Sequence, residues 1–114
     1  GSISKKVTVL NSERRLYLHI AAVFACNFVN HFYEQASDVL KTKGIPFGVL
    51  KPLINETAQK VQELDPFDAQ TGPAVRYDEN IIRKHLDALE SNPSARELYK
   101  SISKSIFEHH QKMS

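Results

Sequence analysis

The chain has 114 residues, 41% of them hydrophobic and 25% charged, with a formal net charge of +2. This composition is typical of one soluble globular domain, long enough to bury roughly two thirds of its unfolded surface. The nearly balanced charge argues against a nucleic-acid-binding protein, and the absence of an apolar run of ~20 residues argues against a membrane-spanning one.

The first predicted element is a short strand. In "KKVTVL", residues 5–10, Val7 and Val9 alternate with Thr8, which is the period of a half-buried strand. No later segment offers this strand a partner, and a lone strand leaves its backbone groups unpaired. We therefore predict that residues 1–10 are a remnant strand or linker and that residues 11–114 form a helical domain.

A long first helix is predicted next, because Asn11 or Ser12 can cap its start and Gly44 can close its end. At about 100° per residue, one broad arc of this helix gathers apolar side chains. We expect that arc to face the core, and it contains Ala21, Ala25, Phe28, Phe32, Ala36 and Val39.

A second side of this helix is polar. His19, Cys26, Asn30 and Ser37 fall within roughly 40° of one another, with Asn27 beside them. Such a stripe is either a set of satisfied contacts between helices or the wall of a site. Cys26 is the only cysteine, which excludes an internal disulfide and is typical of a cytoplasmic protein. We expect it to be a small buried hydrophobe.

Three further helices follow. Residues 47–64 carry a helical apolar stripe, in which Pro52 either kinks the helix or marks its true first turn. The connector behind them should contain short helical turns. A third helix over residues 79–90 is capped by Asp78, and a fourth begins with Pro93 at its first position. The predicted fold is all-α: a bundle of about four main helices with a long first helix, preceded by a short orphan strand.

Metal and nucleotide sites are not predicted in this chain. The five histidines lack the H-E-x-x-H spacing of a zinc site, so we predict no metal. The four glycines form neither G-x-G-x-x-G nor a P-loop. Without these loops no helix N-terminus is shaped to receive a pyrophosphate, so we predict no bound cofactor in this chain.

The segment "TGPAVRYD" is the second candidate site. Arg76 follows the turn formed by Gly72 and Pro73, and an arginine held near a rigid turn can clamp a carboxylate or a phosphate. The alternative is that Arg76 caps a helix end or pairs with Asp78 or Glu79.

Four segments of the sequence resemble a known family: "RLYLHIAAVFACNFVNHFY", "PLINET", "TGPAVRYDENIIRKHL" and "ELYKSIS". Over about residues 7–107 they are similar to the C-terminal helical domain, of unknown function, of Rossmann-like NAD(P)-dependent oxidoreductases. The most specific signatures are R-x-x-x-H-x-A-A-V-F-x-x-N-F from Arg15 to Phe28 and T-G-P-A-x-R-x-D from Thr71 to Asp78. Tyr77 departs from the second signature, where glycine is often found.

The resemblance implies an architecture. In such proteins an N-terminal Rossmann domain binds NADP or NAD. The helical domain is similar to the C-terminal domain of 6-phosphogluconate dehydrogenase, and it commonly dimerises and closes the substrate cleft. On this interpretation the chain is a fragment, inactive alone, and the orphan strand is the last strand of the missing Rossmann sheet. Its partners would be a second copy, its own Rossmann domain and a small-molecule substrate.

The resemblance also implies roles for individual residues. His19 would donate a proton or a hydrogen bond to the substrate, since an imidazole titrates near neutral pH. Asn27, Asn30, Thr71 and Arg76 would bind the substrate, the asparagines by offering both a donor and an acceptor. The competing interpretation is a helical protein–protein interaction module without a catalytic role, in which the polar stripe is a contact between helices.

Overall fold

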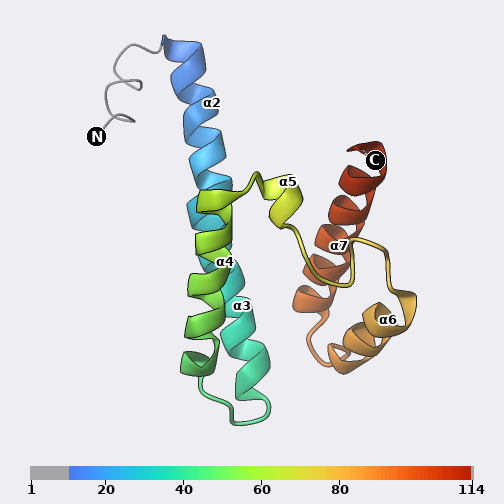
Figure 1. Cartoon of the computed structure of the whole chain (residues 1–114). Coiled ribbons are helices and arrows are strands. Elements are labelled where there is room, and N and C mark those ends of the chain that lie inside the picture. Colours follow the sequence, from blue (N-terminus) through green and yellow to red (C-terminus); the bar gives the residue numbers. More distant parts are fainter. Residues whose placement is uncertain (1–10, 114) are drawn as a thin grey trace. The chain divides into compact units, whose positions relative to one another are not determined.

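The computed structural model describes residues 11–113 (Figure 1). The strand predicted at residues 5–10 lies outside the described residues. Over the described part the chain is all-α, as predicted, and it contains no strand. It divides into two compact units, Gly1–Val49 and Leu50–Ser114. No helix in the described range has both the length and the apolar character needed to cross a bilayer.

The first helix runs without a break through three segments (Figure 1), which are α2 (Ser12–Ala22), the π-helical segment η1 (Val23–Phe28) and α3 (Val29–Lys41). Its start is as predicted, because the Asn11 side chain accepts a hydrogen bond from the Arg14 N–H at 2.9 Å. The helix is followed by a turn in which Gly44 has a φ of 66°, a left-handed conformation that glycine adopts readily.

The segment η1 departs from the predicted uniform α-helix. A π-helix bonds each carbonyl to the N–H five residues on, so its backbone turns through a smaller angle per residue than an α-helix. Across the six residues of η1, the chain therefore accumulates about 100° less rotation about the helix axis than an uninterrupted α-helix would. This lag corresponds to roughly one residue, and it shifts every side chain of α3. The faces of the helix beyond Ala22 are therefore not those that a constant α-helical rotation predicts.

The predicted burial of the first helix is wrong for this chain. Phe28, Phe32 and Val39 are between 39% and 46% exposed, and no residue of α2, η1 or α3 is buried. Cys26, also expected inside, is exposed. The physical reason is that a helix buries its apolar stripe only against a second layer. In the described part of the first unit, residues 11–49, there is little beyond this helix and the turn behind it.

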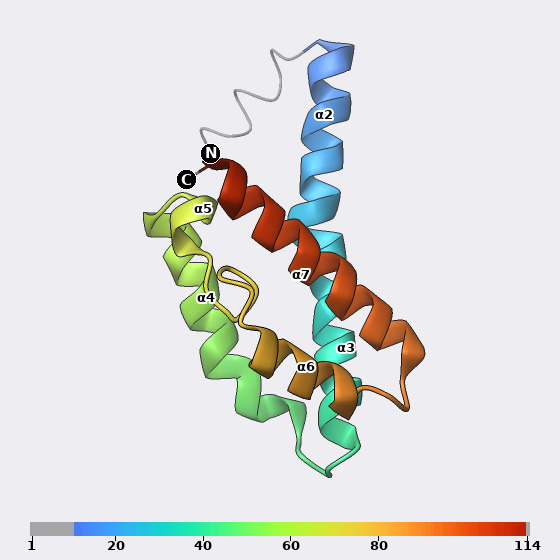
Figure 2. The same cartoon turned by 90° about the vertical axis from the view of Figure 1, so that its right-hand side faces the viewer.

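The second unit contains four helices (Figure 2), which are α4 (Lys51–Glu63), the short α5 (Pro66–Ala69), α6 (Glu79–Ala88) and α7 (Pro93–Met113). Ahead of α4, Phe47–Leu50 form a 3₁₀ turn, η2, so Pro52 lies in the true first turn of α4. The expected short helical turn in the connector is confirmed as α5. The predicted cap of α6 is also confirmed, because the Asp78 carboxylate accepts a hydrogen bond from the Ile81 N–H.

The core of the second unit is small and joins α6 to α7. Ile82 of α6 is 3% exposed, Ala95 of α7 is 7% exposed and Ala74 in the preceding turn is 5% exposed. A hydrogen bond connects the two helices: the Arg96 Nε–H donates to the Leu86 carbonyl at 3.1 Å. The same carbonyl also accepts from the Leu89 N–H at 3.1 Å, so two donors share it at the end of α6.

Candidate functional site

The exposed polar side chains of the first helix form a strip once the π-helical rotation is included. With α3 lagging by roughly one residue, His19 of α2, Asn27 of η1 and His31 of α3 fall within roughly 40° of one another. Glu34 lies about one turn beyond His31 on the same side. We call these four residues the polar strip. Asn30, which a uniform α-helix would align with His19, is turned away from that line by about 80°.

The predicted site residues on this helix are open to solvent. His19, Asn27 and Asn30 are all exposed. None of their side chains makes a hydrogen bond or an ion pair with another residue in the described range. The alternative prediction, amides buried between helices, is therefore not what this chain forms. The three side chains are free to bind a ligand or a partner, and their roles stay predictions.

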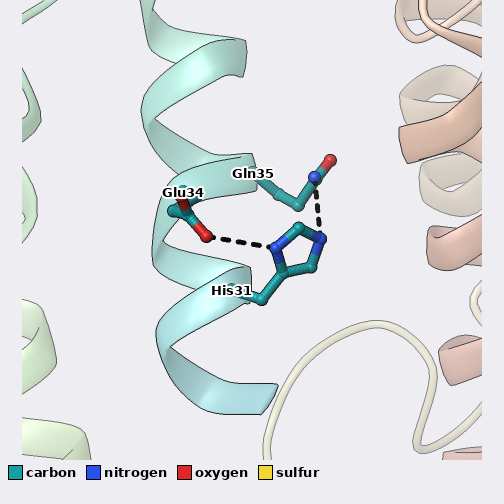
Figure 3. Close-up of polar contacts among 3 residues, drawn as sticks. All are labelled: His31, Glu34 and Gln35. Carbon is teal, nitrogen blue, oxygen red and sulfur yellow. Dashed lines mark hydrogen bonds and ion pairs between the residues drawn. The ribbon is translucent and has the colours of Figure 1, made fainter. Parts of the chain in front are cut away.

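His31 is a candidate that the sequence prediction missed. Its Nδ1 lies 3.1 Å from a Glu34 carboxylate oxygen, and its Nε2 lies 3.2 Å from the Gln35 amide nitrogen (Figure 3). The amide nitrogen can only donate, so His31 Nε2 accepts and Nδ1 carries the proton that is donated to Glu34. The i,i+3 and i,i+4 spacings of these residues are a signal that the sequence contained.

The turn that carries the second signature is held in an unusual backbone conformation. Gly72 has a φ of 103° and Tyr77 a φ of 50°, which is the left-handed region. The Asp78 N–H closes the turn by donating to the Pro73 carbonyl at 2.8 Å. The positive φ at Tyr77 gives a physical reason for the glycine expected at this position from the resemblance, because only glycine adopts such a φ without steric cost.

Arg76 has no partner among the described residues, although the sequence offered it two. Asp78 caps α6, and Glu79 pairs with Arg83 at 3.3 Å, so neither carboxylate engages the exposed Arg76 side chain. Thr71 is exposed as well. Thr71 and Arg76 belong to the second unit and the polar strip to the first, so the predicted substrate-binding residues come from different units.

A groove of about 570 Å³ adjoins this turn within the second unit. Its wall includes the Tyr77 ring, which contacts Phe107 edge-on with 5.4 Å between ring centroids. The floor is partly apolar, and Lys100 and Lys104 of α7 lie at the groove. The volume of this open groove lies within the range of ligand pockets.

The described residues do not fit a nicotinamide dinucleotide or a metal ion. Residues 11–113 contain no parallel sheet and no glycine-rich loop ahead of a helix, which are the features that hold a pyrophosphate. No three His, Cys, Asp or Glu side chains of this range converge on a position where an ion could bind.

The comparison with known proteins decides the family. Residues 1–106 match a family described as a domain of unknown function, DUF2520. The chain belongs to this family. It is also similar to the crystal structure of a protein from Bacteroides fragilis described as a candidate NADP oxidoreductase, with 55% sequence identity and a TM-score of 0.85. No protein of curated function matches the chain.

The two proteins differ in length. The similarity covers 87% of this chain but only 38% of the Bacteroides fragilis chain. The predicted resemblance to the C-terminal helical domain of an oxidoreductase is thus confirmed by the DUF2520 match and by the similarity to this longer protein.

Proposed function

We propose that this DUF2520 chain is the substrate-cleft and dimerisation domain of an NADP- or NAD-dependent oxidoreductase of the cytoplasm, and that a separate Rossmann-like domain binds the cofactor. The observation that carries the proposal is the 55% identity to a much longer protein described as a candidate NADP oxidoreductase. The helical chain accounts for 38% of that protein, which leaves ample length for a cofactor-binding domain.

In this proposal the chain contributes substrate-binding groups rather than the cofactor site. His19 and the two asparagines are exposed and without partners in the described range, as residues that line an open cleft should be. Arg76 is a free guanidinium beside a rigid turn, suited to a carboxylate or a phosphate of the substrate. Thr71 supplies a hydroxyl to the same region.

Calorimetric titration with NADP tests this proposal. This chain by itself should not bind NADP, whereas the protein in which it follows a cofactor-binding domain should bind with micromolar affinity or better. In that longer protein, Arg76→Ala should raise the KM for an anionic substrate and leave NADP binding unchanged. Arg83→Ala is the matched control, because Arg83 is also exposed but already paired with Glu79. Micromolar binding of NADP to this chain alone would contradict the proposal.

The dimerisation role is supported by an apolar ridge on the first helix. The π-helical lag brings six exposed side chains onto one side, and these are Leu16, Ile20, Phe24, Phe28, Phe32 and Val39. They are between 39% and 62% exposed. At ~150–250 Å² for a whole aromatic side chain, the ridge presents on the order of 500 Å². Two copies would together bury about 1,000 Å², the lower bound for a specific interface.

Sedimentation at about 100 µM, far above a typical micromolar Kd, measures this association. We expect a dimer that Phe24→Ser converts to a monomer, because Phe24 is the most exposed residue of the ridge at 62%. Leu53→Ser is the control, since Leu53 is 57% exposed on α4 and lies outside the ridge. A monomeric wild-type chain would exclude the dimerisation role. A dimer in a longer protein that binds no NADP would instead favour a helical interaction module without catalytic activity.

A further inference from the structure

His31 and its two neighbours form a prepared hydrogen-bonding array that the assignment of His19 does not include. The Nδ1–H of His31 donates to Glu34, and the Nε2 lone pair accepts from the Gln35 amide (Figure 3). Both imidazole nitrogens are therefore occupied, and only one neutral tautomer satisfies both contacts. His19 is also a histidine on the same face of the first helix, but its side chain has no such contacts in the described range.

This array does not serve the stability of the fold to any large extent. The side chains of His31 and Glu34 are 55% and 67% exposed, and an exposed pair of this kind contributes little because water screens it. What the pair does determine is which nitrogen carries the proton. A carboxylate on Nδ1–H directs the other nitrogen outward as a proton acceptor, an arrangement that matters for proton transfer rather than for packing.

Two other histidines of the described range make different contacts from those of His31. His85 contacts the Tyr99 hydroxyl, and His110 stacks on Phe67 with 4.2 Å between ring centroids. His31 is on the polar strip, directly after η1, and π-helical segments are frequent at functional sites. Its Nε2 is blocked only by the neutral Gln35 amide, which a ligand can displace at little electrostatic cost.

We propose that His31 Nε2 is the proton acceptor of the polar strip, that it binds the hydroxyl group of an alcohol ligand, and that Glu34 is the positioning residue that fixes the tautomer. The ligand class follows from the donor and acceptor pattern, because the Nε2 lone pair requires a hydrogen-bond donor and the hydroxyl group of an alcohol supplies one. The ligand assignment rests on the proposed function, whereas the assignment of the tautomer does not.

Nitrogen-15 NMR of the histidine rings in this chain, at a pH where they are neutral, tests the tautomer. We expect His31 to carry its proton on Nδ1. Glu34→Ala should shift the ratio of the two tautomers by about two- to fivefold, the range that exposed pairs support. Glu34→Gln should rescue it, because the amide oxygen still accepts from Nδ1–H. Glu79→Ala, which removes a carboxylate from another exposed helical pair, is the matched control. A His31 proton on Nε2, or no response to Glu34→Ala, would overturn the proposal.

Acylation by diethyl pyrocarbonate, a probe of unprotonated ring nitrogens, tests the acceptor role. Mass spectrometry should find His31 modified on Nε2, with a rate that falls in Glu34→Ala while the rate at His19 stays constant. In the longer protein, His31→Gln should abolish alcohol oxidation and leave NADP binding unchanged. If the wild-type longer protein had no NADP-dependent activity, that result would contradict the proposed function but not the tautomer assignment. Full alcohol oxidation by the His31→Gln protein would overturn the inference and leave the proposed function standing.

Discussion

The Tyr99 hydroxyl and the His85 Nδ1 lie 2.7 Å apart and connect α7 to α6. Burial raises the pKa of the Tyr99 phenol above its ordinary value of 10.0, so Tyr99 keeps its proton at neutral pH. The two rings also meet edge-on, with 5.7 Å between centroids. This pair is a tertiary contact of the second unit, since fourteen residues of sequence separate its members.

Removal of this hydrogen bond should destabilise the chain. We expect Tyr99→Phe to lower the free energy of unfolding by about 0.5–1.5 kcal/mol, because the ring stays and only the hydroxyl is lost. Urea unfolding measures the change. Tyr17→Phe is the control, because Tyr17 is 65% exposed and its hydroxyl has no partner in the described range. Equal midpoints for the two variants would show that the Tyr99 hydroxyl contributes nothing.

The same phenol should make stability depend on pH in the alkaline range. The folded-state pKa of Tyr99 is raised above the unfolded value, so its contribution to stability is fully present below about pH 10. It is lost as the pH rises through the folded-state pKa. The stability difference between wild type and Tyr99→Phe should therefore be constant from pH 7 to 9 and should shrink above about pH 10. Urea titrations of both proteins at each pH provide the comparison, and a gap that widens there would refute the assignment.

The left-handed backbone at Tyr77 predicts an order of stability between two small replacements. Tyr77→Gly and Tyr77→Ala both lose the edge contact with Phe107, but alanine retains the steric cost of a φ of 50°. The glycine variant should therefore be more stable than the alanine variant by about 1 kcal/mol. Thermal unfolding of the two proteins side by side gives the difference. An alanine variant as stable as the glycine variant would mean that Tyr77 is not left-handed in solution.

The polar residues of the first helix should be replaceable at little cost to folding. His19→Ala and Asn30→Ala should each change the free energy of unfolding by less than about 0.5 kcal/mol, because both side chains are exposed and unpaired in the described range. Ile82→Ala is the positive control and should cost about 2–5 kcal/mol, since Ile82 is 3% exposed. Chemical denaturation of the three variants decides the matter. A loss of 2 kcal/mol or more at both polar positions would make them structural residues rather than residues of an open cleft.

The helices and their ends could be predicted from the sequence because the signals that set them are local. Asn11 and Asp78 cap helices through hydrogen bonds to an N–H three residues away. Pro52 lies in a first helical turn because it has no N–H to donate. Each of these interactions is complete within one turn of chain, so residue identity and spacing are sufficient to predict it.

The faces of the first helix and the contacts between helices depended on the tertiary structure. No residue-level signal distinguished the π-helical bonding of η1 from α-helical bonding, yet that choice moved Asn30 out of line with His19 and aligned His31 with it. The exposure of Phe28 depended on whether a second layer of chain covers it, which no local pattern states. The Tyr99 hydroxyl contacts His85 only because α6 and α7 pack against each other. Local hydrogen bonding determines where helices begin and end, but rotation accumulated along a helix and packing between distant segments determine which side chains meet.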